Sequence, residues 1–247
     1  MKKTDLLSRA LRSIAARTCF WSQTCTNLYI YRELEKVSLS QAKHIYTHMT
    51  NRELNTLYDL ATGCGIHANV LEIGSYLGAS SCYLVTPLAR QDSHLFCVDT
   101  WENQTMPEGE RDTFSEFSKN TSSLSEYITP VRKRSDDLNE SDIIYPLNLV
   151  FIDGDHSYMA VKSDYDKVAS WIIEGGILAF HDCTYYESVS RVVGEILASG
   201  SWQLAGHVDN LVWLRKVGKE YFTFANPMNA SNLDEVLEKD NGIYKYT

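Results

Sequence analysis

The sequence predicts an α/β fold: a mostly parallel, doubly wound sheet of seven strands with helices on both faces. Short apolar runs alternate with helix-like segments between residues 69 and 199, which is the pattern of right-handed βαβ units. Two later runs, 202–206 and 210–215, are only three residues apart and indicate a C-terminal antiparallel hairpin. Residues 1–48 carry apolar residues at helical spacing and predict an N-terminal helical extension.

The elements can be placed in order along the chain. Thr50 and Glu53 have the spacing of a helix capping box, and Leu54, Leu57 and Leu60 follow on one helical face. The strands expected next are 69–74, 94–99, 127–131, 148–153 and 175–182, and helices are expected near 78–90, 108–120, 136–142, 157–173 and 185–199.

These elements predict one domain at 49–218, because neither an internal repeat nor a low-complexity linker interrupts the pattern. The extension 1–48 precedes it. A polar, weakly patterned tail at 219–247 follows, and it could serve as a lid, as a dimer arm or as loose chain.

The bulk composition excludes several classes of protein. The formal net charge of −9 disfavours binding to nucleic acid or to anionic membranes. Six scattered cysteines without a C-x-x-C pair predict reduced thiols and a cytoplasmic location. No run approaches the ~20 apolar residues of a membrane span. The basic N-terminal helix could be a transit or surface-binding segment, but packing on its own domain or in a homodimer is the simpler reading.

The end of the first strand is a candidate ligand site, because open parallel sheets bind ligands beyond the carboxyl ends of their strands. Glu72, Gly74, Ser75, Tyr76 and Gly78 lie there. Glycines let a turn bring backbone amides close to a ligand, and the next helix presents free N–H groups. The E-x-G-x-x-x-G spacing differs from the G-x-G-x-x-G dinucleotide fingerprint, and an ordinary strand–helix turn is the alternative.

The second and third strand ends offer groups for a nucleoside. Asp99 closes the second strand, where an acid commonly accepts hydrogen bonds from ribose hydroxyls. Trp101 either covers a purine face or packs in the core. Ser135 and Asp136 either meet an adenine edge or cap a helix.

The fourth and fifth strand ends carry acids and histidines: Asp153, Asp155 and His156 after one strand, His181 and Asp182 after the other. The first strand is central in a doubly wound sheet, so the first, fourth and fifth strands run side by side and these groups should share a cleft. Asp155 or Ser157 could simply cap the following helix, but capping alone does not explain two neighbouring strands that both end in acid and histidine.

The chain resembles the class I S-adenosylmethionine-dependent methyltransferases in the segments VLEIGSYLGASS, LFCVDTW and NLVFIDGDHSYMAVKSDYDKVASWIIEGGILAFHDC. The similarity is greatest to the small-molecule O-methyltransferase branch that includes macrocin-type sugar methyltransferases and cephalosporin hydroxylase-like proteins. It covers about residues 50–215. It implies a Rossmann-like fold, S-adenosylmethionine as cofactor, and a hydroxylated small molecule or sugar moiety as methyl acceptor.

The resemblance also implies roles for residues. Gly74, Ser75 and Gly78 would hold the methionine part of the cofactor with Glu72 nearby, and Asp99 would hold the ribose. The remaining candidates for cofactor binding are Tyr76, Trp101, Ser135, Asp136 and Asp153.

A metal site is implied by some members of that family, which bind Mg²⁺ through positions matching Asp153, His181 and Asp182, with Asp155 at the position of the general base. His181 departs from the pattern, because Mg²⁺ prefers oxygen ligands and imidazole suits Zn²⁺, Fe²⁺ or Ni²⁺. A site without metal, in which His156 or His181 is the base, is the other reading.

The sequence thus predicts an S-adenosylmethionine-dependent O-methyltransferase in which Asp155 or His156 is catalytic. A catalytically silent nucleoside-binding or assembly protein of the same fold is the main alternative. An NAD-type oxidoreductase would need a tighter glycine fingerprint. Nucleic-acid methylation is disfavoured by the acidic charge and by the lack of an N/D-P-P-Y/F motif after the fourth strand.

Overall fold

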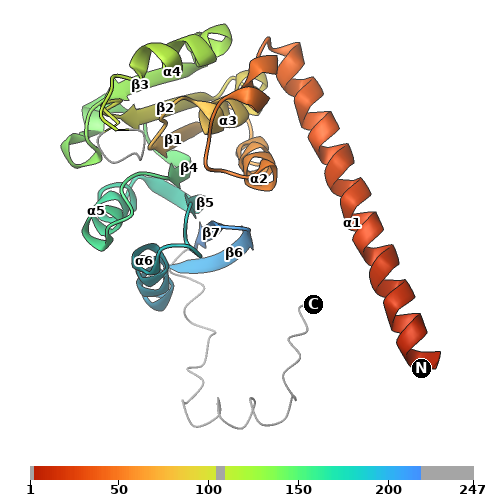
Figure 1. The fold of residues 1–247 in the computed structure, drawn as a ribbon. Coiled ribbons are helices and arrows are strands. Elements are labelled where there is room, and N and C mark those ends of the chain that lie inside the picture. Colours follow the sequence, from red (N-terminus) through yellow and green to blue (C-terminus); the bar gives the residue numbers. More distant parts are fainter. Residues whose placement is uncertain (1–2, 104–108, 218–247) are drawn as a thin grey trace, which may run out of the picture.

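A computed structural model of the protein describes residues 3–103 and 109–217 (Figure 1). A seven-stranded sheet has the order β3-β2-β1-β4-β5-β7-β6, with β1 to β5 parallel and β7 antiparallel to both of its neighbours. This confirms the predicted fold class. The strands are β1 (Asn69–Ile73), β2 (His94–Asp99), β3 (Ile128–Arg132), β4 (Leu147–Ile152), β5 (Ile172–Phe180), β6 (Trp202–Val208) and β7 (Leu211–Lys216).

Helices cover both faces of this sheet (Figure 1). The α-helices are α1 (Lys3–Lys36), α2 (Asn51–Thr62), α3 (Ala79–Arg90), α4 (Phe114–Thr121), α5 (Tyr158–Val168) and α6 (Glu187–Ala198). Short 3-10 helices are η1 (Ser40–His44), η2 (Ser122–Tyr127), η3 (Ser135–Asp137) and η4 (Glu140–Asp142).

The core forms two layers because successive strand residues point to opposite faces. Val70 and Phe151 pack on the face covered by α2 and α3, whereas Leu71 and Val150 pack on the face covered by α5 and α6. Full burial on both faces explains why the central strands are apolar runs rather than alternating ones.

Helix α2 begins at the predicted capping box. The Glu53 N–H donates to the Thr50 hydroxyl at 3.2 Å, and the Thr50 N–H donates to the Glu53 carboxylate at 2.7 Å. Two orphan N–H groups of the first turn are thereby satisfied. This fixes the position of Glu53, which lies beneath the end of β5.

Helix α1 is one continuous helix that leaves the domain at its N-terminal side (Figure 1). Its last turns are anchored by Ile30 and Leu34, both buried in the core. Further from the domain, Trp21 is 64% exposed and Leu28 is 58% exposed. In the described part of the chain, no helix combines the length and the apolar character that crossing a membrane requires.

Three of the predicted helices need correction. The one expected at 108–120 begins at Phe114, and the one expected at 136–142 is replaced by η3 and η4. The one expected at 157–173 ends at Val168, because Trp171 already pairs its carbonyl with the Leu147 N–H at 2.8 Å to open the strand pairing. The predicted tail 219–247 lies outside the described residues.

Candidate active site

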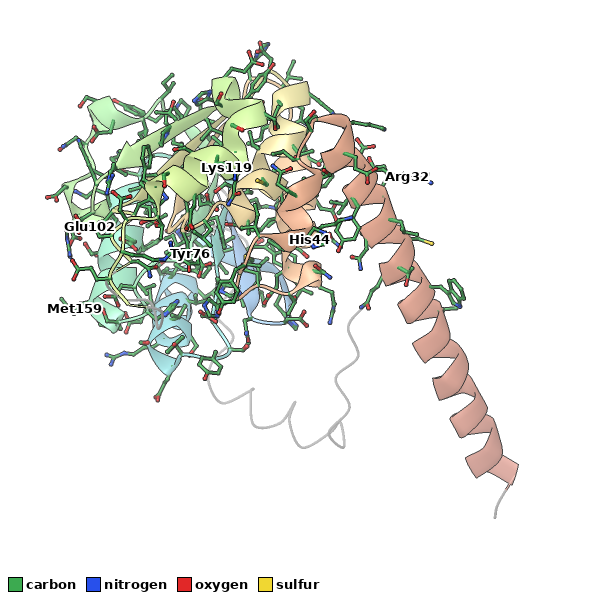
Figure 2. All side chains as sticks on the ribbon, turned by 45° about the horizontal axis from the view of Figure 1, so that its top comes forward. Arg32, His44, Tyr76, Glu102, Lys119 and Met159 are labelled. Carbon is green, nitrogen blue, oxygen red and sulfur yellow. The ribbon has the colours of Figure 1, made fainter. Side chains whose placement is uncertain are left out.

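A cavity of about 860 Å³ opens at the carboxyl ends of the parallel strands, where an α/β sheet is expected to bind ligands. Figure 2 shows the labelled Tyr76 among the sheet and its helices, while Arg32 marks α1 as it leaves the domain. The structure brings these predicted residues to the cavity wall: Gly74, Ser75, Tyr76, Asp99, Ser135, Asp136, Asp153, Asp155, His156, His181 and Asp182.

Gly74 is the point at which the ends of β1 and β4 meet. Its φ is +90°, and a Cβ placed on it would lie 2.0 Å from the carbonyl oxygen of Asp153. The Asp153 N–H donates to the Ile73 carbonyl at 2.8 Å, which locks the contact. Only glycine fits here, and its first function is to let the Asp153 backbone pass close to the turn.

Glu72 does not line the cavity, and its expected place beside the cofactor is corrected. Its buried carboxylate accepts hydrogen bonds from the hydroxyls of Ser75, at 2.8 Å, and of Ser81, and from the Cys97 thiol at 3.4 Å. Burial raises the pKa of Glu72, and the surrounding hydroxyls act in the opposite direction. Glu72 therefore holds the turn in shape from within the core.

Gly78 and Trp101 also lie off the cavity wall. A Cβ on Gly78 would lie 3.0 Å from the Thr121 methyl group, so this glycine allows α3 to pack closely. Trp101 is fully buried, and its ring centroid lies 4.7 Å from that of Phe117. Its indole N–H donates to the Tyr76 carbonyl at 3.0 Å. The expectation that Trp101 covers a purine is corrected, since its role here is packing.

Asp99 is oriented by two backbone donors. The Tyr76 N–H donates to one carboxylate oxygen at 2.8 Å and the Trp101 N–H to the other at 2.6 Å. Each oxygen retains a further lone pair, and the residue lines the cavity. This arrangement suits the expected contact with ribose hydroxyls.

A cluster of acids and imidazoles forms where β4 and β5 end. His181 Nδ1 lies 3.2 Å from Asp153 and 3.5 Å from Asp182, and His181 Nε2 lies 3.4 Å from Glu53. Burial alone would lower the pKa of His181, but Asp153, Asp182 and Glu53 raise it far above its usual range. Both ring nitrogens thus face carboxylates.

His156 completes this cluster on the solvent side. Its Nε2 lies 3.0 Å from Asp182 Oδ2 and 4.0 Å from Asp153 Oδ1, and its ring stacks on Tyr186 with centroids 4.4 Å apart. Burial lowers the pKa of His156, but Asp153 and Asp182 outweigh it and raise the pKa to about 9. Asp182 adopts a φ of +56°, a left-handed conformation that places its carboxylate between the two imidazoles.

Asp155 is differently placed from His156. It is exposed, and one carboxylate oxygen accepts the Ser157 N–H at 2.7 Å. Ser157 in turn caps α5 through the Ala160 N–H at 3.4 Å. Ser157 is therefore the cap of α5, and Asp155 holds the turn that leads into it while it still lines the cavity.

Asp153, His181 and Asp182 have potential ligand atoms within 4.8 Å of one another, as the predicted metal site requires. Two carboxylates and one imidazole fit a divalent cation softer than Mg²⁺. The Glu53 carboxylate behind His181 Nε2 is the kind of partner that orients a metal-binding histidine. The donor set of this chain therefore fits a cation.

Two acids near the site were not predicted as functional from the sequence. Glu53 was interpreted only as a helix cap, since the sequence does not show that β5 ends above it. Asp164, on α5, is buried and lines the cavity. An acid three residues after Val161, on the core-facing stripe of that helix, was the signal that could have identified it.

Comparison with known proteins identifies the domain. Residues 71–183 match the model of a family described as a methyltransferase domain. No curated protein is similar enough to match the chain. The methyltransferase predicted from the sequence is confirmed at the level of this domain.

Solved structures confirm the fold. An O-methyltransferase from Bacillus cereus in complex with SAH has a TM-score of 0.56 at 14% identity, covering 78% of this chain and 97% of that one. The O-methyltransferase TomG from Streptomyces achromogenes in complex with SAM has 0.55 at 16% identity, covering 78% and 96%. An rRNA methylase from Streptococcus thermophilus has 0.51 at 15% identity, covering 69% and 99%. Such identities show the fold alone, and methylases of different acceptors share it.

Proposed function

We propose that this chain, a class I methyltransferase, transfers the methyl group of S-adenosylmethionine to a hydroxyl oxygen of a small molecule or sugar. The observation that carries this proposal is the His156–Asp182 contact, 3.0 Å long, in the same cavity as the turn at Gly74. A sulfonium methyl group bound at the Gly74 turn and a hydroxyl bound at the His156 imidazole would lie in the same cavity. Alignment of this kind can supply several kcal/mol of the barrier.

The reaction requires one displacement and one proton transfer. The acceptor oxygen forms a bond to the methyl carbon while the carbon–sulfur bond breaks. The electron pair of the carbon–sulfur bond goes to sulfur, which leaves a neutral thioether. The proton of the hydroxyl goes to His156, which a neighbouring carboxylate then stabilises as imidazolium.

A divalent cation is part of the proposal. Asp153, His181 and Asp182 would hold it, and when bound it would lower the pKa of a coordinated hydroxyl. His156 and Asp182 would orient the acceptor at the same end of the cavity. Asp155 is the alternative base, with the weaker geometry because one of its oxygens is bound at the α5 cap.

The acceptor end of the cavity is rich in rings. Tyr46, His48, Tyr185 and Tyr186 line the cavity, Tyr185 is exposed, and Tyr186 stacks on His156. Aromatic faces can pack against a planar or sugar ring, and a small-molecule acceptor of that kind is therefore part of the proposal.

The cellular setting is also proposed from the chain. Cys25, Cys64, Cys82, Cys97 and Cys183 are free thiols, as a cytoplasmic protein would have. The exposed Trp21 and Leu28 on α1 make this helix the proposed contact of a homodimer.

Calorimetry with S-adenosylhomocysteine is the first test, and binding is expected. Transfer of a labelled methyl group to a panel of phenols, catechols and sugar nucleotides is the second. His156→Gln should lose roughly 10²–10⁴-fold in turnover with S-adenosylhomocysteine affinity retained, whereas Asp155→Asn should lose far less. Failure to bind S-adenosylhomocysteine would refute the proposal. Binding with no transfer to any acceptor would favour the silent binding protein.

A further inference from the structure

Helix α1 carries a stripe of residues on the side that faces away from its own domain. Trp21 is 64% exposed, Leu28 is 58% exposed, and Cys25 between them is also exposed. Their spacing of four and three residues places them on one side of the helix. Ile30 and Leu34, which anchor α1 in the core, lie on the opposite side. The domain of the same chain is therefore on the wrong side of α1 to cover this stripe.

The same spacing continues toward the beginning of the helix. The residues that precede Trp21 at intervals of three and four are Thr18, Ile14, Leu11 and Leu7. Mostly apolar residues that repeat in this way form the seam of a coiled coil. The 34 residues of α1 span about 50 Å, and the N-terminal part extends away from the domain (Figure 1). This pattern indicates that α1 packs along a second helix.

A groove of about 160 Å³ lies beside the stripe, between α1, α2 and the end of β6. Ser22 and Thr26 of α1 line this groove, and each of them directly follows a residue of the stripe. A helix that packs on the stripe therefore lies next to the groove and can reach into it with a long side chain.

The groove presents hydrogen-bond acceptors. Asn55 is only 7% exposed and lines the groove, and its side-chain oxygen has no hydrogen-bond partner among the residues that the structure describes. The Asn55 amide group donates to Asn27 at 2.5 Å. The exposed Asp59 also lines the groove, as does Arg52, which is paired with Asp209 at 2.8 Å. Because a buried acceptor without a donor is costly, the groove suits a cationic group that donates hydrogen bonds.

The N-terminal half of α1 has the charge that this groove lacks. Residues 1–20 contain five lysine or arginine residues and one acid, Asp5, although the whole chain has a net charge of −9. In a parallel pair of α1 helices, two such basic halves would lie side by side and repel each other. In an antiparallel pair, each basic half would run along residues 21–28 of the other helix, next to the groove. Charge complementarity therefore favours the antiparallel pair.

We propose that α1 pairs antiparallel with α1 of a second copy of this chain, and that Arg12 or Arg17 of each copy inserts into the groove between α1 and α2 of the other. A guanidinium group carries five N–H donors, so one arginine can donate to the Asn55 oxygen and pair with Asp59. An antiparallel pair is twofold symmetric, and both grooves are filled in the same way. This inference rests on the homodimer in the proposed function and is independent of the methyl transfer.

Sedimentation equilibrium on the full chain measures the dimer. Asp59→Arg should weaken dimerisation by about tenfold or more, because a like-charge contact replaces an ion pair. The double variant Arg12→Glu, Arg17→Glu should weaken it similarly, and combining all three changes should recover most of the loss. Glu187→Arg is the matched control: it reverses an exposed acid on α6, on the other face of the sheet, and should leave the dimer unchanged.

The orientation of the two helices has its own test. In a parallel pair in register, the two Cys25 thiols would face each other across the seam. In an antiparallel pair that joins the stripes, they would lie more than about 15 Å apart along the helices, too far for a disulfide. Mild oxidation of a Cys19→Ser variant should therefore give little covalent dimer. Rapid and complete cross-linking through Cys25 would overturn the antiparallel arrangement.

The outcomes separate this inference from the methyltransferase activity. A chain that stays monomeric at every concentration but binds S-adenosylhomocysteine would overturn the dimer and leave the methyl transfer intact. A dimer that Asp59→Arg does not weaken, or that Glu187→Arg weakens equally, would overturn the groove contact. A monomer that binds vesicles of anionic lipid through residues 1–20 would show that a membrane, and not a second copy, takes up the basic half.

Discussion

The two ends of the cavity place the same kind of group in opposite environments. Where β4 and β5 end, Asp153 and Asp182 face the imidazoles of His156 and His181, and the pKa values of both carboxyl groups are lowered despite burial. Beside α5, Asp164 faces no such cation and burial raises its pKa. One end therefore holds its carboxylates in a paired network, and at the other end a carboxylate is buried without an ion-pair partner among the described residues.

This difference has an energetic consequence. A buried network of ions tolerates its charges only while every partner is present, so removing one partner is strongly destabilising. A buried carboxylate without a counter-charge costs stability in the resting protein and is retained where function needs it. The two ends should therefore respond oppositely to neutralising mutations.

The largest effect is expected from Gly74→Ala, which would disturb the contact between the ends of β1 and β4 on which the whole cavity depends. The added Cβ would collide with the Asp153 carbonyl, and alanine is strained at a φ of +90°. We expect a loss of at least about 3 kcal/mol in the free energy of unfolding and no measurable S-adenosylhomocysteine binding. Gly65→Ala is the control, because its φ is +79° but nothing lies within 4 Å. An equal loss in both variants would mean that backbone strain, and not the contact, decides.

Glu53→Gln should destabilise the acid–imidazole cluster at the ends of β4 and β5. It leaves His181 with one carboxylate fewer in a buried site, and we expect urea unfolding at pH 7 to show a loss of about 3 kcal/mol. Burial alone would raise the pKa of Glu53, but His181 and two backbone N–H groups lower it below 4.5. The wild type should therefore lose stability as pH falls below that value, and the variant should show a shallower decline. An unchanged acid slope would contradict the ion pair.

Asp164→Asn should act in the opposite direction. The folded-state pKa of Asp164 is about 6, above the ordinary 3.8. Ionisation of this group in the folded protein above pH 6 therefore lowers the free energy of unfolding. We expect the variant to be more stable at pH 7.5 by up to about 3 kcal/mol, with the difference vanishing near pH 4. Thermal unfolding across this range measures it. A variant that is less stable at every pH would show that the carboxylate serves the fold.

The smallest effect is expected from Trp101→Phe, which tests whether Trp101 belongs to the cavity at all. The change removes the hydrogen bond to the Tyr76 carbonyl and some packing volume, at about 1–2 kcal/mol of unfolding free energy. S-adenosylhomocysteine affinity should stay within about threefold. A large loss of affinity at unchanged stability would restore Trp101 as a stacking residue.

Much of the fold could be predicted because its signals are local. The capping box at Thr50 and Glu53, the apolar runs and the short hairpin spacing each fixed one element, and the rules for parallel sheets ordered them. The helix predicted at 136–142 was wrong because α-helices and short 3-10 turns begin with the same polar, cap-forming residues. The early end of α5 was missed because the apolar stripe continues through Ile172 into β5.

The site was predicted only as far as strand ends determine it. Asp153, His156, His181 and Asp182 converge because β4 and β5 are neighbours. Glu72 and Trp101 lie one layer deeper than expected, since the sequence does not reveal which way a side chain at a strand end or turn points. Asp164 was missed because its distance from the cavity depends on how α5 packs, which is a tertiary property.

Glu53 joins three distant parts of the chain: its carboxylate closes the first turn of α2, accepts the Asn210 N–H at 2.7 Å and faces His181. Asn210 lies in the turn between β6 and β7. During synthesis on the ribosome, the acid–imidazole cluster therefore reaches its final arrangement only after this hairpin has emerged and folded back. A nascent chain that stops just after Asp182 has every acid and histidine of the cluster and still lacks the Asn210 N–H that hydrogen-bonds Glu53.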